Sequence, residues 1–282
     1  MQAWASEYGA VMFETRGVLQ GDRPLALLLH GGHGSWRHWQ ANTDQLSAQW
    51  DLIMPDLPGY GRSCDLPPEA DLSVLSGVLE QAIEHGLGGR LPDLIIGFSF
   101  GTLVASALAE RWQEQGRSPA ALLLVNPPLG REVSPEVVEI QARATQIARE
   151  RGLAAAIELT LREIMLSDSA KVTPELIELG VAQVRETRFK SRPISRSVDL
   201  RVRLQSLTLP RFVILGERDP HQRSRMNERV PQYRSMFGED HVVLLPGAHW
   251  LQYDCPDAFA DTARGMLGRW ANPMRAQAAD RT

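Results

Sequence analysis

Residues 94–101 constrain the fold of this chain more than any other stretch. They read L-I-I-G-F-S-F-G, an apolar run that leads into a serine between two glycines, and good helix formers follow. The pattern predicts a strand, a sharp turn and a helix, with Ser99 at the apex of the turn. Gly97 and Gly101 suit so tight a turn because a side chain there would collide with neighbouring backbone. Ser99 is therefore either an exposed nucleophile or an ordinary helix N-cap. Residues elsewhere in the chain are needed to choose between these two roles.

Strand-sized apolar runs alternate with helical patterns on both sides of this stretch. The runs are residues 25–29, 52–54, 121–125, 212–215 and 241–245. Continuous apolar runs fit strands that are buried on both faces of a parallel sheet. Residues 2–17 alternate instead and predict one antiparallel hairpin at a sheet edge. Together they predict an α/β fold with a mostly parallel sheet flanked by helices.

Residues 130–207 interrupt the alternation, because they contain helical patterns and no strand-like run. The predicted helices span 137–149, 153–166 and 174–188. We expect this segment to form a helical lid, or cap, over the ends of the strands. The core domain is then formed by residues 1–129 and 208–274, and residues 275–282 are expected to be a frayed tail.

Composition narrows the class of protein. The formal net charge is -4 and no basic run is interleaved with aromatic residues, so we expect no nucleic-acid partner. The two cysteines, Cys64 and Cys255, indicate reduced thiols rather than a disulfide framework. We find no signal peptide and no apolar run of membrane-spanning length. A cytoplasmic protein without a membrane partner is the expectation.

Three acid–base candidates stand just beyond predicted strands. They are Ser99, Asp219 and His249. The carboxyl ends of parallel strands share one edge of a sheet, so we expect the three side chains to meet there. A serine nucleophile needs a base within hydrogen-bond reach, and a carboxylate can orient that base. The sequence predicts a Ser–His–Asp triad, with Glu217 as the fallback acid.

Two other pairs of polar residues have structural interpretations. His30 and His33 lie three apart, but no third ligand is near, so we expect no metal site and a structural role for His30. Asp56 and Arg62 are interpreted as a pair that stabilises their loop.

Five motifs in order resemble those of the α/β-hydrolase superfamily. They are H-G-G at 30–32, D-L-P-G-Y-G-R-S at 56–63, G-F-S-F-G at 97–101, G-E-R-D at 216–219 and G-A-H at 247–249. The resemblance covers essentially the whole chain outside residues 130–207. It implies the serine-nucleophile, lid-containing branch, a sheet of roughly eight strands and no cofactor. It also implies an oxyanion hole formed by the backbone N–H groups of Gly32 and Phe100.

The residues at two positions narrow the resemblance. Ser99 disfavours the dehalogenase and epoxide-hydrolase branches, which form an ester on an aspartate. Some members place the acid after an earlier strand, where this chain has Asn126, and an asparagine cannot serve as the acid.

The expected function is hydrolysis of an ester, thioester or related acyl bond of a small, partly apolar molecule through an acyl-enzyme. One alternative is a carbon–carbon hydrolase of the meta-cleavage-product type that acts on a carboxylate-bearing diketone. Another is a non-catalytic, ligand-binding or receptor-like member of the superfamily. The candidate substrate contacts are Trp36, Phe98, Trp250, Arg188 and Arg192. Core packing of the tryptophans and a solvated helix face for the arginines are the structural alternatives, and homodimer formation stays open.

Overall fold

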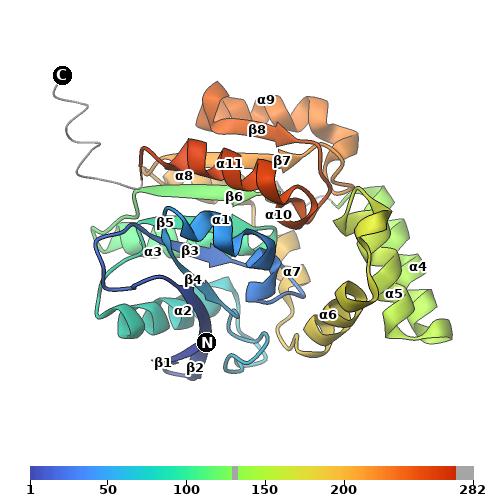
Figure 1. The fold of residues 1–282 in the computed structure, drawn as a ribbon, viewed down its shortest axis with the longest axis horizontal. Helices are drawn as coiled ribbons and strands as arrows, with labels where there is room; N and C mark the ends of the chain where they lie inside the picture. The colour runs from blue at the N-terminus through green and yellow to red at the C-terminus, as the bar shows by residue number, and fades with distance from the viewer. Residues whose placement is uncertain (129–132, 271–282) are drawn as a thin grey trace.

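A computed structural model describes residues 1–128 and 133–270 and contains one eight-stranded sheet (Figure 1). The strand order is β1-β2-β4-β3-β5-β6-β7-β8. The strands are β1 (Gln2–Ser6), β2 (Gly9–Arg16), β3 (Leu25–Leu29), β4 (Asp51–Pro55), β5 (Leu94–Phe98), β6 (Ala121–Val125), β7 (Arg211–Gly216) and β8 (Val242–Leu245). Strands β3 to β8 pair in parallel, and the β1–β2 hairpin joins β4 in antiparallel pairing. The predicted sheet and its edge hairpin are confirmed.

Helices cover both faces of the sheet, which explains the continuous apolar sequences of its central strands. Strands β3, β5 and β6 are buried along their whole length. Helices α2 (Leu72–Leu87) and α3 (Phe100–Glu114) pack on one face. Helix α11 (Pro256–Leu267), with the short segments η1 (Trp36–Asn42) and α1 (Thr43–Ser47), packs on the other. Burial of apolar side chains on two faces is the main stabilising contribution to such a fold.

The segment predicted as one helix over residues 36–48 is two short pieces. A 3₁₀ segment, η1, precedes α1, and Ser35 caps η1 by accepting a hydrogen bond from the Arg37 N–H. At the junction, the Thr43 hydroxyl donates to the Gln40 carbonyl at 3.0 Å. Such a side-chain bond competes with the regular helical pattern, which accounts for the break.

Helices occupy the chain between β6 and β7. They are α4 (Pro135–Arg151), α5 (Leu153–Thr160), α6 (Pro174–Arg185), α7 (Ser191–Ser197) and α8 (Leu200–Ser206). Figure 1 shows α4, α5 and α6 standing away from the sheet at one end, whereas α8 packs against α3. The predicted helix over 153–166 ends earlier, because after Thr160 the chain forms a π segment, Leu161–Met165.

Three parts of the domain prediction lie outside the described residues. These are residues 129 and 271–274 of the predicted core, the start of the predicted lid, residues 130–132, and the predicted tail, residues 275–282. The division into a core domain and a lid therefore stays a prediction.

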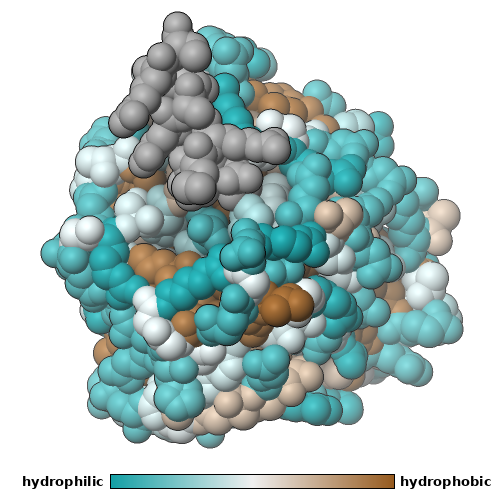
Figure 2. Space-filling view, turned by 60° about the vertical axis from the view of Figure 1, so that its left-hand side comes forward, coloured by the Kyte–Doolittle hydropathy of each residue, from teal (hydrophilic) through white to brown (hydrophobic). Residues whose placement is uncertain are grey.

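Hydrophilic side chains cover most of the face shown in Figure 2, and hydrophobic side chains form small groups between them. Small apolar groups of this kind are usual on a protein surface. None of the helices in residues 1–128 and 133–270 has the length and apolar character that crossing a lipid bilayer requires.

Candidate functional site

The turn between β5 and α3 holds Ser99 in an uncommon backbone conformation. Ser99 has φ 50° and ψ -116°, and it directly precedes the first turn of α3. A Cβ atom on Gly97 would lie 2.6 Å from the Gly101 carbonyl oxygen, and one on Gly101 would lie 2.4 Å from the Leu29 carbonyl oxygen. Both distances are far below van der Waals contact, so the two glycines are required for the turn. The predicted strand, turn and helix are confirmed.

A chain of hydrogen bonds joins Ser99, His249 and Asp219. His249 Nε2 lies 3.0 Å from the Ser99 hydroxyl oxygen, and His249 Nδ1 lies 2.8 Å from Asp219 Oδ2. Asp219 is fully buried, and its other oxygen, Oδ1, accepts the backbone N–H of His221 at 2.9 Å. The structure thus brings together the three side chains that the sequence placed at the strand ends. Glu217 is exposed, so it is not the partner of His249.

The charge state of the buried pair follows from its surroundings. Burial raises the pKa of Asp219. The charge and hydrogen bond of His249, together with His221, lower it by more than burial raises it, so the net pKa lies below the ordinary value. Asp219 is therefore a carboxylate at neutral pH, which can accept from His249 Nδ1 and fix its tautomer.

Asn126 connects the loops that carry Asp219 and His249, and sequence reasoning considered it only as a missing acid. Its Nδ2 donates to the carbonyl oxygens of Ala248, at 3.1 Å, and His249, at 2.9 Å. Its Oδ1 accepts the Gly216 N–H at 2.8 Å. Asn126 is buried at the end of β6 with φ 44°, a left-handed conformation that asparagine tolerates better than most residues.

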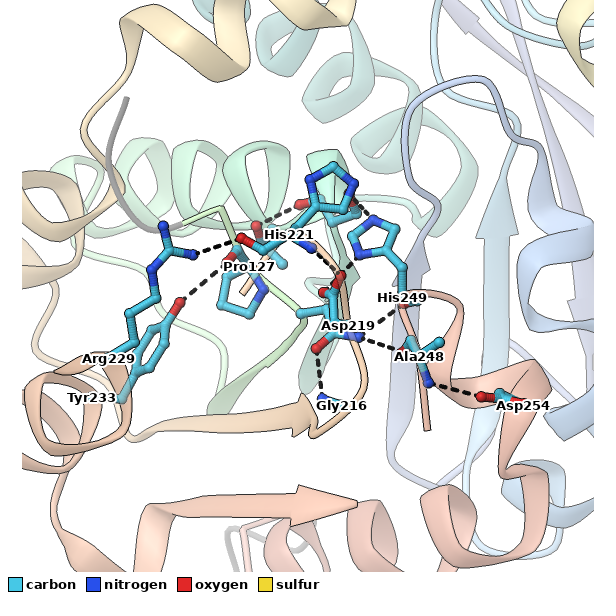
Figure 3. A network of polar contacts seen from close by, with 12 residues as sticks. Pro127, Gly216, Asp219, His221, Arg229, Tyr233, Ala248, His249 and Asp254 are labelled. Atoms are coloured by element: carbon cyan, nitrogen blue, oxygen red, sulfur yellow. Dashed lines mark hydrogen bonds and ion pairs between the residues drawn. The ribbon is translucent and has the colours of Figure 1, made fainter. Parts of the chain in front are cut away.

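Two further contacts hold the His249 loop from the side of α4–α6. The N–H groups of His249 and Trp250 donate to the carbonyl oxygens of Ile164 and Met165, in the π segment, at 3.2 and 2.8 Å. Asp254 accepts the Ala248 N–H at 2.8 Å, as Figure 3 shows. The position of His249 thus depends on residues from three separate parts of the chain.

His221 and Arg229 lie beside the triad and were not identified from the sequence. The rings of His221 and His249 have centroids 4.4 Å apart. Arg229 Nη1 donates to the His221 carbonyl oxygen at 3.3 Å (Figure 3). Burial and the neighbouring His249 lower the pKa of His221 to about 4, so its ring is neutral at physiological pH. His221 follows Asp219 by two residues, which was the available sequence signal, whereas nothing in the sequence marks Arg229.

The loop of residues 30–34 lies against the Ser99 turn. A Cβ atom on Gly31 would lie 3.3 Å from Ser99 Cβ, and one on Gly32 would lie 2.8 Å from Ser191 Oγ and 3.9 Å from Phe100 Cβ. Phe100 is the first residue of α3, and the first N–H groups of a helix have no partner within it. Gly32 and Phe100 are therefore neighbours beside the serine.

The residues interpreted as structural have backbone partners. His30 is fully buried, and its Nε2 accepts the Leu57 N–H at 2.9 Å. Asp56 accepts N–H groups of Trp36 and Arg62 at 3.0 and 3.3 Å. Asp56 therefore holds Arg62 through its backbone.

A cavity of about 520 Å³ opens above Ser99. Of the predicted substrate contacts, Phe98, Trp250 and Arg192 line it, as do Gly32 and Phe100. Residues of α5, the π segment and α6 form much of the remaining lining, and most of them are apolar: Leu153, Ala156, Ile157, Leu161, Ile164, Met165, Leu176, Gly180 and Val184.

Two predicted substrate contacts lie elsewhere and are corrected. Arg188 is outside the described lining, because its guanidinium forms an ion pair with Asp65 and donates to the carbonyl oxygens of Gly61 and Ser63. Trp36 is also outside it. Its N–H is held by Asp56, and the Arg37 guanidinium lies 5.9 Å from its ring centre.

Within the described ranges, one group of side chains has the spacing of metal ligands, namely Asp219, His221 and His249, whose ligand atoms lie within 4.8 Å of one another. Both ring nitrogens of His249 already have partners in Asp219 and Ser99. A metal at this place would displace one of these hydrogen bonds, so the group suits proton transfer better than metal binding.

The sequence is similar to those of known proteins. A sequence model described as "Alpha/beta hydrolase family" matches residues 26–262. A pimeloyl-[acyl-carrier protein] methyl ester esterase from Nitrosospira multiformis is 27% identical over 85% of this chain and 92% of its own length. An epoxide hydrolase 4 from Mus musculus is 24% identical over 85% of this chain and 72% of its own length.

Solved structures have the same fold. The enol-lactonase from Burkholderia xenovorans LB400 superposes with a TM-score of 0.73 at 20% sequence identity, over 95% of this chain and all of that one. The carboxylesterase CesB from Bacillus subtilis superposes with a TM-score of 0.72 at 18% identity, over 94% of this chain and 90% of that one.

Proposed function

The chain belongs to the alpha/beta hydrolase family, and from that premise we propose that it is a serine hydrolase that cleaves an ester bond of a small, partly apolar molecule. The observation that carries the proposal is the hydrogen-bonded series from Ser99 through His249 to Asp219, with separations of 3.0 and 2.8 Å. A related esterase that covers most of both chains supports the same reaction class.

In the proposed mechanism, the Ser99 hydroxyl oxygen attacks the ester carbonyl carbon while His249 Nε2 takes the hydroxyl proton. Asp219 holds the imidazole in the right tautomer and stabilises its protonated form. His249 then gives the proton to the leaving alcohol, which departs and leaves an acyl group on Ser99. A water molecule, deprotonated by His249, attacks the acyl carbon and releases the acid and free Ser99.

The negative charge of each tetrahedral intermediate needs donors in place before the reaction. We assign this role to the backbone N–H groups of Gly32 and Phe100, which are neighbours beside Ser99. Loss of one such donor costs about 10²–10³ in rate in related chemistry.

We also infer that α4–α6 act as a lid, because these helices supply much of the cavity lining. The shape and polarity of the lining would then select the substrate, while Ser99 and its partners perform the reaction.

A fluorophosphonate probe tests the nucleophile directly. We expect the wild-type protein to be labelled at Ser99, and Ser99→Ala to abolish both labelling and p-nitrophenyl ester hydrolysis, because such triads lose on the order of 10⁶ in kcat without the serine. Asp219→Asn should lower kcat by about 10⁴, whereas Glu217→Gln serves as the matched control on the same loop. Undiminished labelling of the alanine variant would reject the mechanism.

A substrate panel separates the ester reaction from carbon–carbon cleavage. It contains p-nitrophenyl esters of several acyl lengths and a vinylogous diketo acid. Hydrolysis of the diketo acid alone would overturn the ester assignment, and the absence of any turnover and labelling would favour a ligand-binding protein.

A further inference from the structure

The cavity above Ser99 has a positively charged lining although the whole chain carries a formal net charge of -4. Three arginines, Arg192, Arg196 and Arg229, are among its described lining residues, and no aspartate or glutamate is. Elsewhere, many arginines pair with carboxylates, for example Arg117 with Glu84. The unbalanced charge is thus concentrated where a substrate would bind.

Arg229 is the clearest case, because it is only 6% exposed. Its hydrogen bond to the His221 carbonyl oxygen is long, at 3.3 Å, and it has no ion pair within the described ranges. Burial lowers the pKa of Arg229, but an arginine in a protein stays protonated. The charges of Asp219 and Glu228 act on Arg229, but neither carboxylate forms an ion pair with it in the described ranges. A buried guanidinium without a directly paired carboxylate is costly, and a bound anion would lower that cost.

Arg192 reaches the same part of the cavity from the other side. It lies in α7, whose first residue, Ser191, lies over Gly32. The charge of Arg192 lowers the pKa of both His33 and His221, so its guanidinium acts on both flanks of the site. Arg196, one helical turn along, adds a second positive charge, and the described lining offers it no carboxylate.

The rest of the lining is suited to an apolar chain. The side chains that α5 and the π segment contribute are mainly aliphatic, and Trp250 adds an aromatic ring. A molecule that fills this cavity would combine apolar carbon with a group that satisfies the arginines. Carboxylates and phosphates match the planar donor set of a guanidinium.

We propose that the substrate carries an anionic oxygen group, a carboxylate or a phosphate, which Arg229 and Arg192 bind while its ester group lies at Ser99. The inference rests on the proposed ester hydrolase function and narrows it to esters of acidic molecules. The positive cavity also attracts such substrates before they bind.

A matched pair of substrates tests the proposal on the wild-type protein. The p-nitrophenyl monoester of glutaric acid ends in a carboxylate, and p-nitrophenyl pentanoate has the same chain length without charge. We expect kcat/KM to be at least about tenfold higher for the charged ester at low salt, and the preference to shrink at 0.5 M NaCl because salt screens the attraction. Free glutarate and inorganic phosphate, tested as competitive inhibitors, identify which anion fits.

Charge-removing variants assign the effect to residues. Arg229→Gln and Arg192→Gln should each lower the ratio of charged to neutral kcat/KM by about 10- to 100-fold, as expected for a charge-assisted hydrogen bond. Arg185→Gln, next to the lining residue Val184 but outside the described lining, is the control and should keep the wild-type ratio. Thermal melting of each variant shows whether it still folds. Arg229→Lys keeps the positive charge and shows whether loss of that charge, rather than loss of folding, changes the ratio.

The outcomes distinguish the two proposals. If fluorophosphonate labels Ser99 and both esters are hydrolysed equally at every salt concentration, the anion inference is wrong and the hydrolase assignment stands. If neither labelling nor hydrolysis occurs, the hydrolase assignment itself fails, and the inference with it.

Discussion

Replacing Asn126 by aspartate exchanges one buried amide group for a carboxyl group of almost the same shape. Oδ1 of the new side chain can still accept the Gly216 N–H, as it does at 2.8 Å in the wild type. The other position, where Nδ2 donates to the Ala248 and His249 carbonyl oxygens, becomes an oxygen. If the carboxyl group is ionised, both donations are lost and three oxygens face one another.

The cost follows from the two lost hydrogen bonds and the carbonyl oxygens left without partners. Each neutral hydrogen bond contributes about 1 kcal/mol, and each unsatisfied buried group costs about 1–3 kcal/mol. We expect Asn126→Asp to lower the free energy of unfolding by about 3 kcal/mol at pH 8. With an m-value near 3 kcal/mol/M, the urea midpoint would fall by about 1 M.

The loss should depend on pH in a defined direction. A protonated carboxyl group can donate to one of the two carbonyl oxygens, so folding favours the protonated form and the folded pKa of the new carboxyl lies above its unfolded value of about 3.9. The loss of stability relative to wild type is therefore small near pH 4 and grows as pH rises through the folded pKa. The measured quantity is the difference from wild type at each pH.

Activity separates positioning of the triad from general stability. Because Asn126 holds the backbone of His249, we expect kcat on a p-nitrophenyl ester to fall by about 10²-fold at pH 8. Asn42→Asp is the matched control, since Asn42 is also buried and its Nδ2 donates to the Pro256 carbonyl oxygen at 3.2 Å, away from Ser99. It should lose stability without a comparable loss of kcat. Wild-type stability and kcat for Asn126→Asp at pH 8 would refute the reasoning.

Two further substitutions and a titration test other parts of the structure. Gly101→Ala should lower the free energy of unfolding by several kcal/mol, because its Cβ would strike backbone at 2.4 Å, whereas Gly265→Ala, with open space around the new methyl group, should raise it by about 0.5–1 kcal/mol in urea unfolding. Equal stability of the two variants would contradict the account of the turn. His30 and His221 have folded pKa values of about 4 against 6.5 when unfolded, so their contribution is complete above pH 6.5 and is lost as pH falls toward 4. Each should remove about 2 kcal/mol by pH 5, and a urea midpoint that stays constant from pH 7 to pH 5 would exclude this effect.

The sheet could be predicted from the sequence because buried parallel strands leave a direct signal. Residues 25–29 and 121–125 are apolar throughout since both faces are covered, and the predicted bounds match β3 and β6. The break between η1 and α1 could not be predicted, because it depends on a side-chain hydrogen bond of Thr43 that helical periodicity does not reveal. The π segment could not be predicted, because contacts distant in sequence shape it. The π segment offers its carbonyl groups to the loop of His249, about 85 residues away in the chain.

The triad could be predicted for a topological reason, since Ser99, Asp219 and His249 each follow a strand of the same sheet. The substrate contacts were less predictable, because the direction of a side chain depends on its packing. Arg188 and Arg192 look alike in the sequence, yet the first closes a loop with Asp65 and the second lines the cavity.

The π segment, Leu161–Met165, has a consequence for how a substrate enters. Its last residues hold the backbone of His249 and Trp250. Moving this segment outward would break those bonds and displace His249, the base of the proposed mechanism. Helix α6, in contrast, contacts the core through the Gln183 side chain, which donates to Ser35 at 3.0 Å, and through apolar packing of Leu176. If the proposed lid opens at α6, the bonds from the π segment to the His249 loop stay intact, so substrate could pass on that side without displacing His249.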